Sequence, residues 1–83
     1  MILQRRHKDD DTTRAMVRRK VDVLSAGEIL NWCDAAGTGV ATALNDYRRE
    51  GSIESLIDAQ EGLVALLGCL DVLKARAGTP NRR

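Results

Sequence analysis

Two segments of about 25 residues each, 26–50 and 53–77, carry apolar side chains at helical spacing and are separated only by Gly51 and Ser52. In both segments apolar or small residues recur every three or four positions, which is the period of one helix face. Because the connection is so short, we expect the two helices to fold back on each other. The predicted fold class is all-α, an antiparallel helical hairpin whose two helices are each about 37 Å long.

Local signals mark the ends of both helices. Ser25 and Glu28 have the spacing of a capping box, in which each side chain bonds the backbone N–H of the other residue. Ser52 and Ser55 are both candidate caps for the second helix, and the sequence does not choose between them. Basic residues in its last turn, followed by Gly78, predict where that helix stops.

The register of the hairpin can be predicted from a reversal near Gly51. The expected facing pairs are Tyr47 with Leu56, Leu44 with Ala59, Val40 with Leu63, Ala36 with Leu67, and Cys33 with Leu70. In this register large residues oppose small ones, as interdigitation requires. Two stripes of small residues are a further candidate for a tight contact, within the chain or between copies: Ala36, Gly39 and Ala43, and Gly62, Ala65 and Cys69.

The middle of the hairpin is too apolar to stand alone. Residues 35–44 and 62–70 carry no charged side chain, and a helix that is apolar all round is a buried helix. Either the N-terminal segment covers this region as a third helix, or two copies pair into a four-helix bundle. We expect pairing into a dimeric helical bundle, with the chain itself as its first partner.

The N-terminal segment has two interpretations. A shorter helix over residues 12–23 is predicted, with an extended arm as the alternative because residues 21–23 alternate like a strand. The expected organisation is a charged arm over residues 1–10, one helical domain over 11–77 and a polar tail over 78–83.

Charge is divided unevenly along the chain. Residues 1–24 hold seven basic and four acidic residues, whereas residues 25–77 hold four basic and eight acidic ones. Clustered Lys and Arg are typical of phosphate binding, and the nucleic-acid candidates are Arg14, Arg18, Arg19 and Lys20. Against this, no aromatic residue lies nearby for base stacking. The other interpretation is that the basic segment pairs with the acidic hairpin of its own chain or of a partner copy.

The cysteines and the composition favour an ordinary intracellular helical domain. There is no Phe, one Trp and one Tyr, so the core is expected to be aliphatic, which suits helices better than a β-sandwich. Cys33 and Cys69 do not make a disulfide framework, and both are predicted to be small buried hydrophobic residues. No export signal or membrane span is visible, so a cytoplasmic protein is expected.

No catalytic, metal or cofactor site is predicted. His7 precedes three aspartates at 9–11, but the glycine turn and spaced oxygens of a calcium loop are missing. Gly37-Thr38-Gly39 lacks the strand and the Lys-Ser/Thr pair of a phosphate loop. The single histidine lies outside the predicted helices, and no nucleophile has an evident base.

Four residues are of the types that dominate protein interfaces: Trp32, Tyr47, Arg48 and Arg49. The expected function is a non-enzymatic interaction or regulatory module that self-associates and binds a protein partner. One alternative is a small nucleic-acid-associated protein that grips phosphates, and another is a structural subunit of a larger assembly such as a phage particle. Ten Arg against three Lys, with abundant Ala and Gly, suggests a bacterial or phage source with a GC-rich genome.

Overall fold

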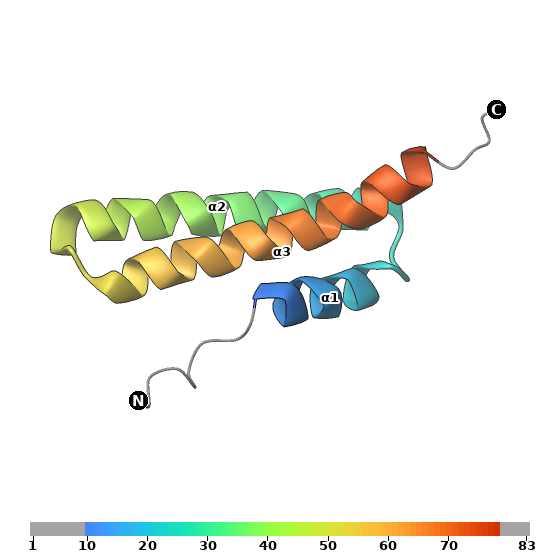
Figure 1. The fold of residues 1–83 in the computed structure, drawn as a ribbon. Helices are drawn as coiled ribbons and strands as arrows, with labels where there is room; N and C mark the ends of the chain where they lie inside the picture. Colours follow the sequence, from blue (N-terminus) through green and yellow to red (C-terminus); the bar gives the residue numbers. More distant parts are fainter. Residues whose placement is uncertain (1–9, 79–83) are drawn as a thin grey trace.

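The structure is a computed structural model that describes residues 10–78. These residues form three α-helices: α1 (Asp10–Val21), α2 (Ala26–Glu50) and α3 (Ile53–Ala77) (Figure 1). The all-α prediction is confirmed for this part of the chain. Most of the predicted charged arm, with His7 and Asp9, and most of the predicted polar tail lie outside the described residues.

Side-chain caps set the starts of α2 and α3, and a glycine in the left-handed conformation ends α2. Ser25 and Glu28 form the predicted capping box: Glu28 N donates to Ser25 Oγ at 3.1 Å, and Ser25 N donates to Glu28 Oε1 at 2.9 Å. α2 ends at Gly51, whose φ of 67° is the left-handed conformation that favours glycine. Ser52 then caps α3 by accepting from Glu54 N at 3.1 Å, while Ser55 is buried inside the helix.

α1 is a helix, so the extended-arm alternative is wrong. It spans Asp10–Val21 rather than the predicted 12–23, and the expected boundary between residues 10 and 11 falls within its first turn. Two aspartates lie in its first turn and three basic residues in its last, which suits the helix dipole at both ends. The strand-like alternation at residues 21–23 is instead the end of α1 at Val21 and a turn after it, in which Leu24 N donates to Val21 O at 3.0 Å.

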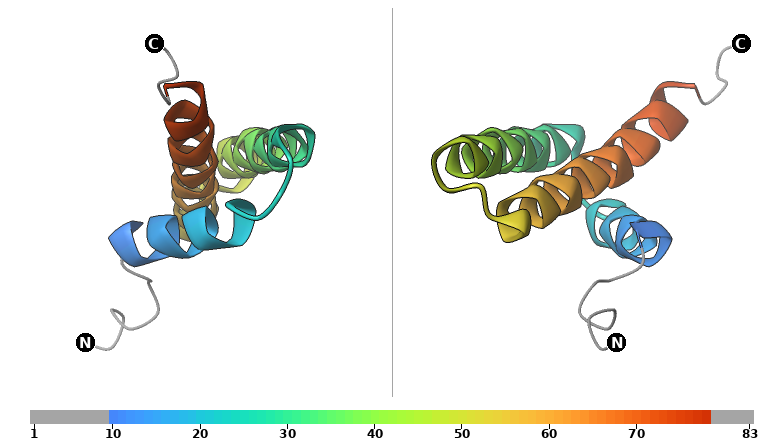
Figure 2. Two further views of the ribbon diagram at one scale, coloured as in Figure 1. Left: turned by 90° about the vertical axis from the view of Figure 1, so that its right-hand side faces the viewer. Right: turned by 60° about the vertical axis from the view of Figure 1, so that its left-hand side comes forward.

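The three helices are arranged around α3. α3 returns alongside α2 after the turn at Gly51, and α1 crosses α3 at an angle (Figures 1 and 2). α1 packs mainly on α3 and makes little contact with α2. The Cα radius of gyration is 14.8 Å, whereas a compact domain of this length has about 12 Å. The molecule is therefore elongated and leaves much of its helix surface open.

The predicted facing pair of Val40 with Leu63 is wrong by one residue on α3. A Cβ atom built on Gly62 would lie 2.7 Å from Val40 Cγ2 and 3.4 Å from the Ala36 carbonyl oxygen, so Val40 faces Gly62 and not Leu63. Ala43 and Ala59 are also buried. A shift of one residue turns a helix by about 100°. The helices are thus rotated so that small residues meet, and the leucines expected in the seam turn outward.

The core lies at one end of the molecule, where α1, the start of α2 and the end of α3 meet. Its buried members are Val17, Val21, Ile29, Cys69 and Val72, with Leu24, Cys33, Ala65 and Leu73 packed against them. α1 approaches α3 closely here, because a Cβ on Gly68 would lie 2.9 Å from Val17 Cβ. Within residues 10–78, none of the helices combines the length and apolar character needed to cross a bilayer.

Candidate functional site

Five leucines on α2 and α3 remain 39–53% exposed although they lie in well-formed helices; we call them the leucine face: Leu30, Leu44, Leu63, Leu67 and Leu70. On α3 the spacing of four and then three residues places its three leucines in one stripe. On α2, Leu30 and Leu44 are about four turns apart and lie on one side of the helix.

The two halves of the leucine face point the same way. Leu44 directly follows Ala43 and Leu63 directly follows Gly62, and both preceding residues lie in the α2–α3 contact. When two helices run in opposite directions, the residues that follow their contact positions project to the same side of the pair. α1 packs elsewhere on α3, over Gly68 and Val72. The described part of the chain therefore leaves the leucine face uncovered.

The centre of the leucine face is uncharged, and its edges are charged. It falls in the two uncharged stretches, 35–44 and 62–70. One turn beyond the outermost leucines lie exposed charged residues, Arg48 after Leu44 and Lys74 after Leu70. Gly37 lies between Leu30 and Leu44, and a Cβ there would have no neighbour within 4 Å. An apolar centre with a polar rim is the anatomy of a protein–protein interface.

The four predicted partner-binding residues do not form one site. Trp32 and Tyr47 are 41% and 40% exposed, but they are about 22 Å apart along α2. Trp32 precedes the contact residue Cys33, so it lies on the flank of α2 opposite the leucine face. Tyr47, Arg48 and Arg49 gather near the turn. Arg49 Nη2 pairs with Asp46 Oδ1 at 2.8 Å, and Arg48 Nη1 donates to Asn45 Oδ1 at 3.4 Å.

The predicted nucleic-acid cluster is divided by an ion pair. Arg14 donates two hydrogen bonds to the Asp71 carboxylate, Nε to Oδ2 at 2.7 Å and Nη2 to Oδ1 at 2.8 Å. Arg18 Nη1 adds a third bond to the same carboxylate at 3.1 Å. These bonds, chiefly the one from Arg14, hold the pKa of Asp71 well below its usual range. Arg19 and Lys20 are exposed, and neither is in an ion pair within residues 10–78.

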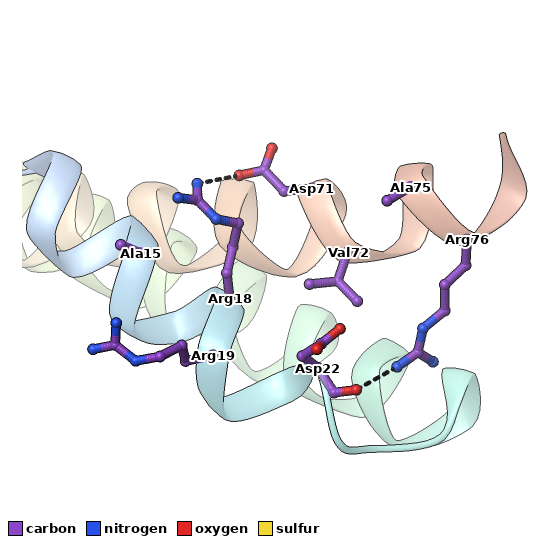
Figure 3. Close-up of a pocket in the computed structure, with 8 residues that line it drawn as sticks. All are labelled: Ala15, Arg18, Arg19, Asp22, Asp71, Val72, Ala75 and Arg76. Atoms are coloured by element: carbon purple, nitrogen blue, oxygen red, sulfur yellow. Dashed lines mark hydrogen bonds and ion pairs between the residues drawn. The ribbon is translucent and has the colours of Figure 1, made fainter. Parts of the chain in front are cut away.

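A shallow cleft of about 540 Å³ lies between α1 and the last turns of α3 (Figure 3). Arg76 Nη2 donates to the Asp22 carbonyl oxygen at 2.9 Å across it. The lining combines three arginines, two aspartates and three small apolar residues: Arg18, Arg19, Arg76, Asp22, Asp71, Ala15, Val72 and Ala75. It holds no histidine, cysteine or hydroxyl side chain that could act as a nucleophile with a base.

Neither this cleft nor the leucine face follows from a local sequence pattern. The cleft depends on where α1 crosses α3, which no local pattern encodes. One signal was available for the ion pair: Asp71 directly follows the uncharged stretch 62–70, and a carboxylate on such a helix needs a basic partner.

Among residues 10–78, no three His, Cys, Asp or Glu side chains lie close enough together to hold a metal ion. Comparison of the chain with protein-family models, with curated proteins and with solved structures finds no match.

Proposed function

We propose that this chain is a non-enzymatic helical interaction module whose antiparallel α2–α3 hairpin self-associates through the leucine face into a dimeric four-helix bundle. The observation that carries the proposal is the row of five half-exposed leucines on one side of the hairpin, four of which fall in its two uncharged stretches. Exposed apolar surface of this kind marks interaction sites in monomers. Each leucine that becomes covered contributes about 1 kcal/mol to the free energy of dimerisation, because only the exposed half of its side chain is removed from water.

The dimensions of the leucine face suit a weak interface with a second copy of the same chain. Leu30 and Leu44 are 14 residues apart, so the face is about 21 Å long, and two helices 8–10 Å apart make it about 20 Å wide. The product is about 420 Å², which is about half of the roughly 800 Å² that each partner buries in a standard interface and is typical of a weak, concentration-dependent contact. A twofold axis would place the leucines of one copy against those of the other, which makes the face self-complementary.

The dimer leaves other surfaces free for a protein partner. α1 and the cleft lie away from the leucine face, and the turn at Gly51 carries Tyr47, Arg48 and Arg49 in exposed positions. Tyrosine and arginine are enriched in the energetically important parts of interfaces. Under this proposal the turn binds an acidic surface of a protein partner while the leucine face holds the dimer together.

Nucleic-acid binding is the second candidate function. It is favoured by the exposure of Arg19 and Lys20 beside each other at the end of α1. The bonds from Arg14 and Arg18 to Asp71 weigh against it, because those guanidinium groups would have to leave a carboxylate to reach a phosphate.

Light scattering coupled to size-exclusion chromatography tests self-association. Injected over a range from low to high micromolar, the protein should change from the mass of one chain to the mass of two. A single-chain mass at every concentration would contradict the proposal.

A further inference from the structure

The two cysteines of the chain lie together at the contact between α2 and α3. Cys69 is fully buried in the core, and Cys33 packs against the same core cluster. Burial, and after it the neighbouring Cys33 thiol, raises the pKa of Cys69 above its ordinary value. Both thiols are free in this structure.

The helix register places the two cysteines opposite each other. Val40 faces Gly62, and Cys33 lies seven residues before Val40 just as Cys69 lies seven residues after Gly62. Seven residues are nearly two full turns, so both cysteines stay on the faces that meet. Because α3 runs back along α2 (Figure 1), these steps arrive at the same level of the pair.

The close approach of the two helices near the cysteines favours a bridge between them. A disulfide needs Cα atoms about 4.4–6.8 Å apart, whereas helix axes commonly pack 8–10 Å apart. At Gly62, two turns before Cys69, the backbones approach more closely than usual, because a Cβ there would lie 3.4 Å from the Ala36 carbonyl oxygen. Cys33 is also partly exposed, which gives a small oxidant access to one member of the pair.

We propose that Cys33 and Cys69 form a reversible intramolecular disulfide when the protein meets a peroxide. The Cys33 thiolate attacks one peroxide oxygen, the O–O bond breaks, and the departing oxygen leaves as water, so that Cys33 becomes a sulfenic acid. The Cys69 sulfur then attacks the Cys33 sulfur, the S–O bond breaks, and a second water leaves. Two thiols lose two electrons and two protons in total, and hydrogen peroxide is reduced to two waters.

The disulfide would lock the α2–α3 pair at the end far from the Gly51 turn. It closes a loop of about 37 residues, and a cross-link of that size is expected to raise the melting temperature by about 10 °C or more. A thiol reductant would reverse the change. This site is separate from the leucine face and does not depend on self-association.

The test treats the dilute, fully reduced protein with hydrogen peroxide and then alkylates all free thiols in denaturant. The expected product is a single chain lighter by two hydrogen atoms that takes up no alkyl group, together with the rise in melting temperature. A Cys33→Ser variant should show no rise. A matched variant, Cys33→Ser with Asp34→Cys, keeps two thiols but moves one to an exposed position about 100° around α2, and it should form no intramolecular bridge.

Three results would overturn the proposal. One is a treated protein in which both cysteines still take up alkyl groups. Another is a mass gain from sulfinic acid or from links between chains in place of the internal bridge. The last is the Asp34→Cys variant closing its bridge as readily as the natural pair, which would show that the register of Cys33 and Cys69 has no part in the reaction.

Discussion

The Asp71 carboxylate on α3 accepts hydrogen bonds from Nε and Nη2 of Arg14 on α1, at 2.7 and 2.8 Å, and this pair links the short N-terminal helix to α3. Only two residues of α1, Val17 and Val21, are buried. A short helix is held mainly by its tertiary contacts, so the position of α1 rests on the burial of Val17 and Val21 together with this ion pair.

Asp71→Asn should therefore lower stability, and the loss should depend on pH. Because the folded pKa of Asp71 is depressed, its contribution is complete above the unfolded value of about 3.9 and is lost as pH falls below that value. Measured by urea unfolding, the free energy of unfolding of the natural protein should fall more between about pH 5 and pH 3 than that of the variant. Asp46→Asn is the control, because Asp46 pairs with Arg49 within α2 alone; equal pH profiles for all three proteins would contradict the role of Asp71.

Gly68→Ala should separate α1 from α3. An added Cβ would lie 2.9 Å from Val17 Cβ and 3.1 Å from the Arg14 carbonyl oxygen, and the backbone atom cannot give way without moving α1. We expect a destabilisation of about 1–3 kcal/mol, as for other overpacked sites, measured by thermal or urea unfolding. Unchanged or increased stability would show that α1 does not lie on Gly68.

Gly37→Ala and Gly39→Ala form a matched pair that reports on the leucine face. A Cβ at either position would have no neighbour within 4 Å, so each change should stabilise the monomer by up to about 1 kcal/mol through helix propensity. Only Gly37 lies between leucines of the face, and an added methyl there should weaken the dimer. Light scattering should show a higher dissociation constant for Gly37→Ala than for Gly39→Ala, and equal constants would place the interface elsewhere.

Binding to a labelled DNA duplex should be weak and should fall only gently with salt. The logarithm of the binding constant falls linearly with the logarithm of the salt concentration, and each neutralised phosphate adds about 0.9 to that slope. Arg19 and Lys20 alone would give a slope of about 2. Fluorescence anisotropy from low to physiological salt measures it. A steep slope that disappears when Arg14, Arg18, Arg19 and Lys20 are changed to Ala would instead promote nucleic-acid binding to the first candidate function.

The parts of the fold that depend on local chemistry could be predicted. The Ser25–Glu28 capping box places the start of α2, since all its donors and acceptors lie within four residues. Gly51 and Ser52 likewise place the turn, although Ser52 was not separable from Ser55 by sequence alone.

The sequence could not choose between two rotations of α2 against α3, one with leucines in the contact and one with the small residues Gly62, Ala65 and Cys69 there, which is the one observed. Leu63 and Gly62 are neighbours in sequence, and both registers are compatible with the helical period. The choice depends on how closely the two backbones can approach, which favours Gly62 against Val40 and leaves Leu63 outside. The partner of Arg14 depends in the same way on tertiary contacts, and only a general attraction between the basic segment and the acidic hairpin was predictable.

Sedimentation equilibrium of Leu67→Glu beside Val23→Glu tests self-association most directly. Leu67 lies on the leucine face, whereas Val23 is 84% exposed in the turn after α1, so both changes place a carboxylate on the surface of the monomer. If the face holds the dimer, the natural protein and Val23→Glu will dimerise at micromolar concentration and Leu67→Glu will stay a monomer with its helical content unchanged. Equal association of all three proteins would contradict the account.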